Sequence, residues 1–418
     1  MKTKGRKWCF ITTSVSFVER RLINMNTKCN ICGNEVKTSY SLKYIDLLGS
    51  GQHEYYQNVA VCPNCGYIFT QNPFSSEQLE NRYGKMSKFE YDVDSYQYVV
   101  KDNLRHQCIR QKNFIEENVT DYASIFEVGA ASGYNLSIYK MCRGGGVEPS
   151  SLNCALAKKN YGVDLYNGMF SEYYSSVGTN RKYDLVFLSM VLEHIVNPFD
   201  FICQCGEICE KYIFVEVPTL DYKYIEEPFG MFCEEHVSMF TLESLTYMMN
   251  HAGFSLINKE IIFEDNLYLP AGYPAIASIW KKEDMTIDDN KLKPEISSED
   301  CFKNYVKNNE MYLETVKDKI NLIPDDIKLA IWGVGHHVSM LLANTRLSVK
   351  NIVRVYDSDK RKEGSKIAGI PIHPFDLNDI RTGDVEAILI TTYTAQKSID
   401  DCLKSLNINI PIYKLYDI

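Results

Sequence analysis

The sequence predicts an α/β protein with two doubly wound units that follow a small cysteine-rich module. Short apolar strands alternate with helical periodicity from Ser124 onward, and this alternation is typical of parallel sheets covered by helices. A glycine turn follows the first strand of each unit, as FEVGAASGYN at Phe126–Asn135 and as GVG at Gly333–Gly335. The charged stretch Lys281–Pro294 has few large apolar side chains and is predicted to link the two units.

Length and composition indicate a globular protein with several cores. The chain has 418 residues, of which 45% are hydrophobic and 24% are charged, enough for two or three domains. A net charge of −9 argues against a nucleic-acid surface, and no apolar run reaches the ~20 residues of a membrane helix. We expect four segments: a disordered leader at 1–26 with Met25 as an alternative start, the cysteine-rich module at 27–93, and units at 94–281 and 282–418.

The fourteen cysteines are interpreted as reduced. The chain is long, and Trp8–Val18 has hydroxyl residues and no clear cleavage site, unlike a secretory signal. A reducing, cytoplasmic compartment is therefore expected. Most cysteines, such as Cys203, Cys205 and Cys209 of one predicted helix, are expected to be buried as small apolar side chains.

Four cysteines have the spacing of a metal site. Cys29-x2-Cys32 and Cys62-x2-Cys65 are each followed directly by a glycine, as in turns that curl around a metal. The long spacer between the pairs predicts two knuckles bridged by a small sheet. Four thiolates leave no open position, so we expect structural zinc rather than catalytic zinc. The alternative is four ordinary reduced cysteines.

The first glycine turn carries acids at two strand ends. Glu127 would repel a phosphate and suits a cationic or hydroxylated ligand, while Gly129 and Gly133 let the backbone pass close to it. Glu148, at the end of the next strand, is placed to accept both hydroxyls of a ribose. A dinucleotide site would show a third glycine, in G-x-G-x-x-G, which is missing here.

This pattern resembles the first motif of class I S-adenosylmethionine (SAM) methyltransferases. The resemblance covers Glu127-x-Gly129-x3-Gly133 and Glu148, and it implies that Glu127 lies near the methionine end of SAM. Asn135 and Ser189 are further candidate cofactor-binding residues. SMVLEHIVNP at Ser189–Pro198 resembles the segment after the fourth strand of the same family. Its His194 is more readily interpreted as a structural or helix-capping residue than as a functional one.

An irregular segment past the fifth predicted strand has the composition of an active-site loop. Thr219–Met239 is rich in acids and aromatics, and Glu234, Glu235 and His236 stand together in it. A carboxylate beside an imidazole can raise its basicity and produce a general base near neutral pH. The alternative is a solvated acidic loop with one packed histidine.

The order of parts resembles three-domain sugar C-methyltransferases that act on nucleotide-linked keto-deoxysugars. The resemblance spans about residues 27–418 and implies that His236 is the general base, that Glu235 supports it and that Tyr83 contributes from a loop. It also implies zinc and SAM as cofactors, a nucleotide sugar as substrate and a substrate-binding C-terminal unit. The chain departs from the family at Glu234, usually histidine, and at Cys233, usually aromatic.

Other functions remain open on the sequence alone. The departures leave O- or N-methylation of a related glycan precursor as an alternative. An NAD(P)-dependent oxidoreductase that uses the glycine turns is a second alternative, and a zinc-bearing interaction protein is a third. The GVG turn at Gly333–Gly335 suits phosphate or ribose, but a tight turn with no ligand is as well supported. The oligomeric state is not predicted.

Overall fold

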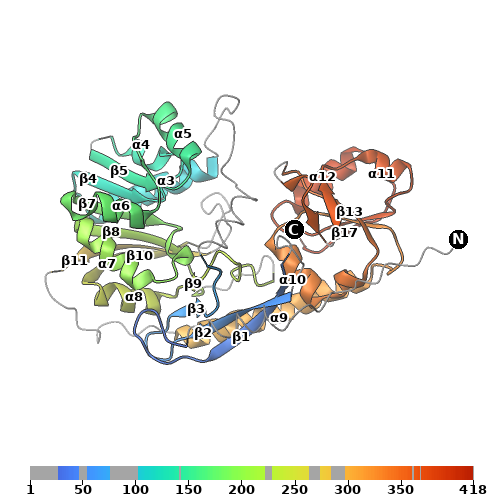
Figure 1. The fold of residues 1–418 in the computed structure, drawn as a ribbon, viewed down its shortest axis with the longest axis horizontal. Coiled ribbons are helices and arrows are strands. Elements are labelled where there is room, and N and C mark those ends of the chain that lie inside the picture. Colours follow the sequence, from blue (N-terminus) through green and yellow to red (C-terminus); the bar gives the residue numbers. More distant parts are fainter. Residues whose placement is uncertain are drawn as a thin grey trace.

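A computed structural model shows three β-sheets, one in each of three parts of the chain (Figure 1). The two Rossmann-like units lie at opposite ends of the molecule, and the cysteine-rich module lies along one side between them. The predicted α/β fold class is confirmed. The structure describes residues 27–46, 54–75, 102–140, 143–221, 228–262, 274–283, 297–359, 362–367 and 369–417.

The cysteine-rich module is a four-stranded antiparallel sheet in the order β1-β2-β3-β9. Its strands are β1 (Thr38–Ile45), β2 (Glu54–Val61), β3 (Ile68–Thr70) and β9 (Ser238–Met239). The small sheet between the two cysteine pairs was predicted, but β9 was not. This strand follows His236 in the chain and pairs with β3, so that Ile68 lies opposite Met239. The segment with the candidate general base therefore completes the sheet of the module.

The second unit is a seven-stranded sheet in the order β10-β11-β8-β7-β4-β5-β6. Its strands are β4 (Ser124–Val128), β5 (Arg143–Glu148), β6 (Tyr166–Asn167), β7 (Tyr183–Ser189), β8 (Cys209–Pro218), β10 (Phe254–Ile262) and β11 (Ala275–Lys282). The strands from β8 to β6 are parallel, whereas β11 runs antiparallel to both β8 and β10. The chain order reverses between β4 and β7, and ligands bind at such switch points.

Helices cover this sheet, and one sequence prediction about them is wrong. The helices are α3 (Asp102–Asn118), α4 (Tyr134–Ile138), α5 (Ser151–Tyr161), α6 (Phe170–Ser176), α7 (Pro198–Ile208) and α8 (Leu242–His251), with short 3-10 turns at Gly178–Asn180 (η1) and Leu192–His194 (η2). Ser150 caps α5 by accepting a hydrogen bond from the backbone of Asn153. Cys209 was placed in the helix with Cys205, but it is the first residue of β8.

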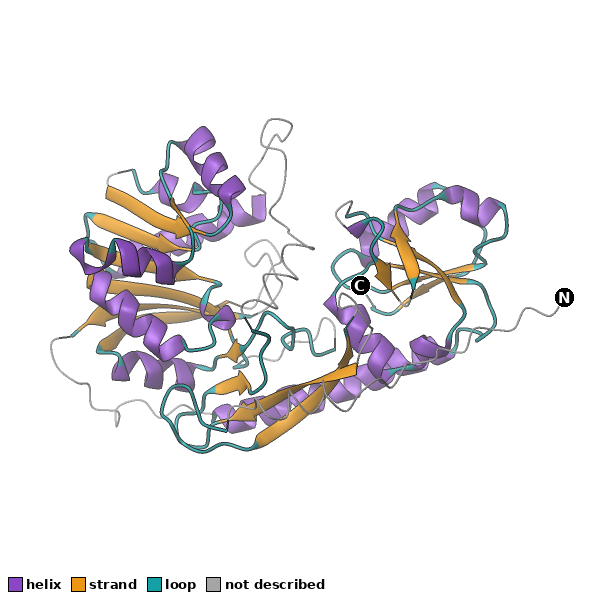
Figure 2. Ribbon diagram, viewed as in Figure 1, coloured by secondary structure: helices purple, strands orange, loops and turns teal. Residues whose placement is uncertain are grey.

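The C-terminal unit is a six-stranded sheet in the order β14-β15-β13-β12-β16-β17. Its strands are β12 (Leu329–Trp332), β13 (Ile352–Tyr356), β14 (Lys366–Ile367), β15 (Ile370–His373), β16 (Ala387–Ile390) and β17 (Ile412–Lys414). Its helices are α9 (Ser298–Asn321), α10 (His336–Asn344), η4 (Arg346–Val349), α11 (Leu377–Arg381) and α12 (Gln396–Ser405). Figure 2 shows that the long helix α9 runs beside the β1–β2 hairpin, which it contacts through β2. In the described part of the chain, no helix combines the length and the apolar character that a membrane span requires.

Candidate active site

The first glycine turn has a backbone that requires its glycines. Gly129 and Gly133 both have φ of 72°, a conformation that residues with side chains rarely adopt. A Cβ on Gly133 would lie 2.8 Å from Cβ of Ala157, and one on Gly129 would lie 3.2 Å from Cγ2 of Val191. The turn therefore passes close to α5 on one side and to the segment after β7 on the other.

Glu127 and Asn135 form a buried polar pair inside this turn. Asn135 Nδ2 donates to Glu127 Oε1 over 3.0 Å. The other oxygens of the pair, Glu127 Oε2 and Asn135 Oδ1, are buried and have no hydrogen-bond partner among the described residues. The pKa of Glu127 is raised to about 8, mainly by burial and in part by nearby Glu148, while the hydrogen bond from Asn135 opposes the shift. Unsatisfied acceptors beside an acid fit a ligand that brings donors and positive charge, such as the methionine end of SAM.

Glu148 lies at the end of β5, beside the turn, as predicted. Its Oε2 accepts from the backbone N–H of Ala131 over 2.9 Å, and its Oε1 accepts from the N–H of Ser150 over 2.9 Å and from Asn153 Nδ2 over 3.3 Å. A carboxylate has about four acceptor sites, so these bonds fix the carboxylate and still leave capacity for a hydroxyl. The geometry fits the expected ribose acceptor.

Ser189 belongs to a polar network that the sequence did not reveal. Its Oγ accepts from Gln111 Nε2 over 2.9 Å, and the same amide donates to Glu216 Oε1 over 2.9 Å. Arg110 pairs with the other oxygen of Glu216 over 2.5 Å. Gln107 also donates to Glu216, over 2.8 Å. Through these bonds, helix α3 supplies a charged and two amide partners to the buried acid Glu216 near the end of β8.

A cluster of one buried carboxylate and two imidazoles lies next to the glycine turn. The side-chain ligand atoms of Glu193, His194 and His236 all lie within 4.8 Å of one another. The two imidazole rings meet edge to face, with centroids 5.2 Å apart. Val191, which packs against Gly129, is two residues before Glu193. The cluster is thereby placed at the carboxyl ends of the central strands, where open α/β sheets bind ligands.

Within this cluster the carboxylate is that of Glu193, a residue that was not predicted to support His236. Burial raises the pKa of Glu193, and the neighbouring His194 and His236 oppose the shift. Glu235 contributes its backbone carbonyl, 2.9 Å from Nδ1 of His194. Glu234 accepts a hydrogen bond from the hydroxyl of Tyr55. The support of His236 by Glu235 stays a prediction, and Tyr83 lies outside the described residues.

The loop that carries His236 is held by contacts from the module and from the C-terminal unit. The carbonyl oxygen of Phe232 accepts from Tyr44 of β1 over 2.5 Å and from Nε2 of His336 of α10 over 3.2 Å. The backbone N–H of Phe229 donates to Asn309, and that of Met231 donates to Tyr305, both on α9. These bonds order a segment that the sequence presented only as irregular.

Comparison with known proteins identifies the unit that contains this site. Residues 100–259 match the family model of a methyltransferase domain. These residues form a class I SAM-dependent methyltransferase domain. The chain therefore contains a SAM-dependent methyltransferase domain, which supports methyltransferase activity and gives no support to the oxidoreductase alternative. A search of curated proteins found no match to the chain.

Solved structures similar to the methyltransferase domain cover about half of the chain. A SAM-dependent methyltransferase from Archaeoglobus fulgidus has 16% identity and a TM-score of 0.34, and the match covers 44% of this chain and 95% of that one. The N-methyltransferase NodS from Bradyrhizobium japonicum, in complex with S-adenosylhomocysteine, has 8% identity and a TM-score of 0.36, with 48% and 96% covered. A Burkholderia thailandensis 1,6-didemethyltoxoflavin-N1-methyltransferase has 12% identity and a TM-score of 0.38, with 53% and 98% covered.

The four predicted metal ligands come together outside the methyltransferase domain. The sulfur atoms of Cys29, Cys32, Cys62 and Cys65 all lie within 4.8 Å of one another. The Sγ atoms of Cys29 and Cys65 are 3.5 Å apart and those of Cys32 and Cys62 are 3.4 Å apart. Both distances are far longer than a disulfide bond of ~2.05 Å and are close to the edge of a tetrahedron with Zn–S of ~2.3 Å. The cluster is compatible with a zinc-binding module.

The glycine turn of the C-terminal unit has one hydrogen bond in common with the methyltransferase turn. The backbone N–H of Val334 donates to Oδ2 of Asp357, at the end of the next strand, over 2.8 Å, as Ala131 does to Glu148. Here, however, the ammonium group of Lys362 lies 2.9 Å from the same carboxylate and also donates to the carbonyl of Val334. The charge of Asp357 is thus already balanced, which favours a structural turn over a ribose site.

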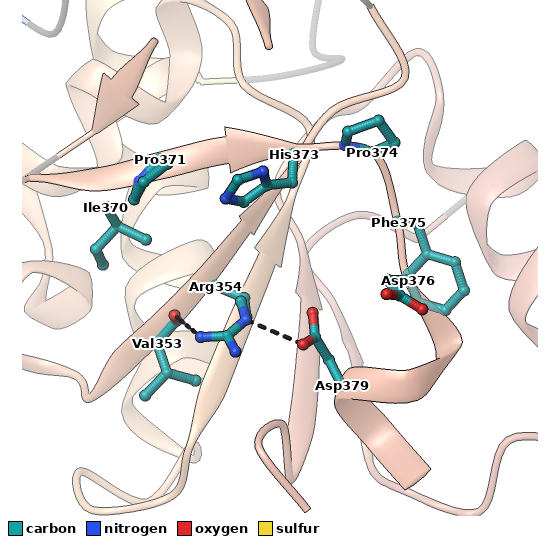
Figure 3. Close-up of a pocket in the computed structure, with 9 residues that line it drawn as sticks. All are labelled: Val353, Arg354, Ile370, Pro371, His373, Pro374, Phe375, Asp376 and Asp379. Carbon is teal, nitrogen blue, oxygen red and sulfur yellow. Dashed lines mark hydrogen bonds and ion pairs between the residues drawn. The ribbon is translucent and has the colours of Figure 1, made fainter. Parts of the chain in front are cut away.

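A cavity of about 710 Å³ lies elsewhere in the C-terminal unit, between β13, β15 and α11 (Figure 3). The guanidinium of Arg354 points across it toward Asp379, 3.2 Å away, and also pairs with Asp384. Asp376 and the exposed His373 also line the cavity. Because its arginine is already paired with two carboxylates, this cavity is poorly suited to an anionic nucleotide.

Proposed function

We propose that the protein C-methylates a keto-deoxysugar carried on a nucleotide, with His236 as the general base. The single observation that supports this proposal most directly is the position of His236 beside a buried carboxylate and next to the glycine turn. A carbon next to a ketone becomes nucleophilic only after it loses a proton, so C-methylation requires such a base. A buried carboxylate nearby stabilises the imidazolium that proton abstraction produces.

The residues have separate tasks in this reaction. When bound, SAM supplies an electrophilic methyl group on a sulfonium. Glu127 and Asn135 hold its amino-acid end, Glu148 accepts a hydrogen bond from its ribose, and Gly129 and Gly133 allow the close approach. His236 takes the proton from the sugar carbon and keeps it while the carbon–carbon bond forms. His194, whose side chain is 38% exposed, then offers a route for that proton to solvent.

The substrate class rests on the resemblance in the order of parts rather than on a cavity. The cysteine-rich module binds structural zinc through Cys29, Cys32, Cys62 and Cys65. The C-terminal unit contributes to binding of the nucleotide. The boundaries of the three parts of the chain are those proposed from the sequence, at 27–93, 94–281 and 282–418. None of the twelve described cysteines forms a disulfide bond, which suits a reducing compartment such as the cytoplasm.

The test of the proposal separates carbon deprotonation from methyl transfer. His236→Ala is expected to keep its affinity for SAM and to lose about 10²–10⁴ in turnover, as general-base variants do. Without SAM, the unmutated enzyme should exchange the α-proton of a nucleotide-linked keto sugar in deuterated water, and the variant should not. His251→Ala, at the exposed end of α8, is the matched control. Near-normal methylation by His236→Ala would rule out the enolate route and favour an O- or N-methyl acceptor.

A further inference from the structure

We propose that Glu193, His194 and His236 form a second metal site, which binds a divalent first-row transition metal such as zinc. The site is separate from the four cysteines, because it lies in the methyltransferase domain and uses nitrogen and oxygen ligands. It also does not rest on the proposed sugar substrate, since metal binding is a property of the resting protein. Two imidazoles and one carboxylate are a common ligand set for zinc and for non-haem iron.

The three side chains already converge. Their ligand atoms lie within 4.8 Å of one another, and Nε2 of His194 is 3.9 Å from Oε1 of Glu193. Ligands that bind zinc at ~2.0–2.2 Å are roughly 3.3 Å apart in a tetrahedral site. Small rotations of these side chains would therefore close the cluster around an ion, with no change in the backbone.

His194 is oriented as metal-binding histidines are. Its Nδ1 lies 2.9 Å from the carbonyl oxygen of Glu235. A carbonyl can only accept a hydrogen bond, so Nδ1 of a neutral His194 carries the proton, and the lone pair is on Nε2, which lies 3.9 Å from Oε1 of Glu193. Metal-bound histidines nearly always donate their second N–H to such an acceptor, which fixes both the tautomer and the ring.

Glu193 is a buried carboxylate whose charge calls for a cation. The residue is 3% exposed, and its Oε2 is buried with no hydrogen-bond partner among the described residues. An uncompensated buried carboxylate is costly, and buried charges are normally paired or bound to metals. Two hydrogen bonds link the backbone segments that carry the cluster. The N–H of Val237 donates to the carbonyl of Glu193 over 2.9 Å, and Ser238 Oγ donates to the carbonyl of Ile195 over 2.6 Å.

Ligation has a consequence for the base. A metal on His236 would use the lone pair that proton abstraction needs, so the ion and the proton exclude each other at that nitrogen. The competing explanation is that the three side chains only share a proton. Spectroscopy with a metal probe, in the absence of SAM and sugar, distinguishes the two.

The experiment is a titration of the metal-free full-length protein with cobalt(II). The first equivalent should show the sulfur-to-metal charge-transfer band of the four-cysteine site. Binding of a second equivalent of cobalt(II) should add ligand-field absorption bands without increasing the charge-transfer band. Glu193→Gln and His194→Ala should weaken binding of the second equivalent by more than about tenfold and leave binding of the first unchanged, which shows that the loss is confined to the second site.

Glu235→Gln is the matched control, because it keeps the backbone carbonyl that orients His194, and it should retain both equivalents. Binding of a single equivalent by the unmutated protein would overturn the proposal. So would a second equivalent that survives in Glu193→Gln and His194→Ala, because the site would then lie elsewhere. Neither result depends on methyl transfer, so failure of the metal site and failure of the C-methylation proposal are distinguishable.

Discussion

His336 donates from Nε2 to the carbonyl oxygen of Phe232 over 3.2 Å, and this bond connects the C-terminal unit to the loop that carries His236. The same carbonyl accepts from Tyr44 of the cysteine-rich module. Three parts of the chain thus meet four residues before the candidate base. The C-terminal unit consequently has a second role besides any part in substrate binding, which is to position this loop.

His336→Ala is therefore expected to lower methyl-transfer turnover by roughly tenfold, about the value of one hydrogen bond, with unchanged SAM affinity. Steady-state kinetics together with SAM titration would measure both. His373→Ala is the control, since this exposed histidine lies in the same unit at the cavity of Figure 3. Equal kinetics for His336→Ala and the unmutated enzyme would show that the loop holds its position without this contact.

With no metal on the Glu193, His194 and His236 cluster, Glu193→Gln should reduce turnover more than Glu235→Gln, by at least about tenfold, because a charged partner of the base contributes about 1.5–3 kcal/mol. The carboxylate of Glu193 belongs to the cluster with His236, whereas Glu235 reaches His194 through its backbone. Turnover and SAM affinity of both variants are the measurement. The reverse order would restore Glu235 to the role that the family resemblance implies.

SAM affinity should rise with pH up to about 8 and then level off. The pKa of Glu127 is raised by burial to about 8, so below that pH the acid is mostly protonated in the free protein. A cationic ligand favours the ionised form, and binding must then release a proton. The slope is about tenfold in affinity per pH unit well below the pKa. Calorimetry in buffers of different ionisation enthalpy measures the released proton.

The matched variant for this prediction is Glu127→Gln, which has no carboxyl proton to release. Its SAM affinity should be weak and should not vary between pH 6 and about 8 through this group. A pH-independent affinity in the unmutated protein would mean that Glu127 does not face the charged end of SAM.

Glu148→Ala is expected to weaken SAM binding by at least about tenfold, because hydrogen bonds to a charged group contribute about 1.5–3 kcal/mol. The substitution also removes the acceptor of the Ala131 and Ser150 N–H groups. Asn153→Ala is the control, because it removes only a donor to Glu148 at 3.3 Å. Unchanged affinity in a folded Glu148→Ala protein would place the ribose acceptor elsewhere.

Gly66→Ala should destabilise the protein more than Gly33→Ala. Both glycines follow a cysteine pair with positive φ, 70° and 74°, so the backbone strain is similar, about 1–2 kcal/mol. A Cβ on Gly66 would meet Oγ of Ser298, whereas one on Gly33 meets nothing within 4 Å. The added contact should cost a further ~1–3 kcal/mol, measured by denaturant unfolding at fixed zinc. Equal losses would show that Ser298 moves aside.

Much of the cofactor site follows from the sequence because its residues are close to strand ends. Glu127, the two glycines and Glu148 occupy the ends of two strands that are adjacent both in the chain and in the sheet. The two cysteine turns are likewise predictable, because each depends only on the spacing of two cysteines within one turn. Local periodicity and turn chemistry are sufficient for such features.

The tertiary structure alone decided which groups meet across long distances in the chain. Glu193 meets His236 because β9 leaves the methyltransferase segment and joins the sheet of the cysteine-rich module. Arg110 reaches Glu216 because α3 packs over the ends of the central strands. The periodicity of the sequence does not predict these contacts, because they depend on how the folded helices and strands pack against one another. The sequence by itself determined the α/β fold, the glycine turn and the cysteine knuckles, and packing between units determined what surrounds the base.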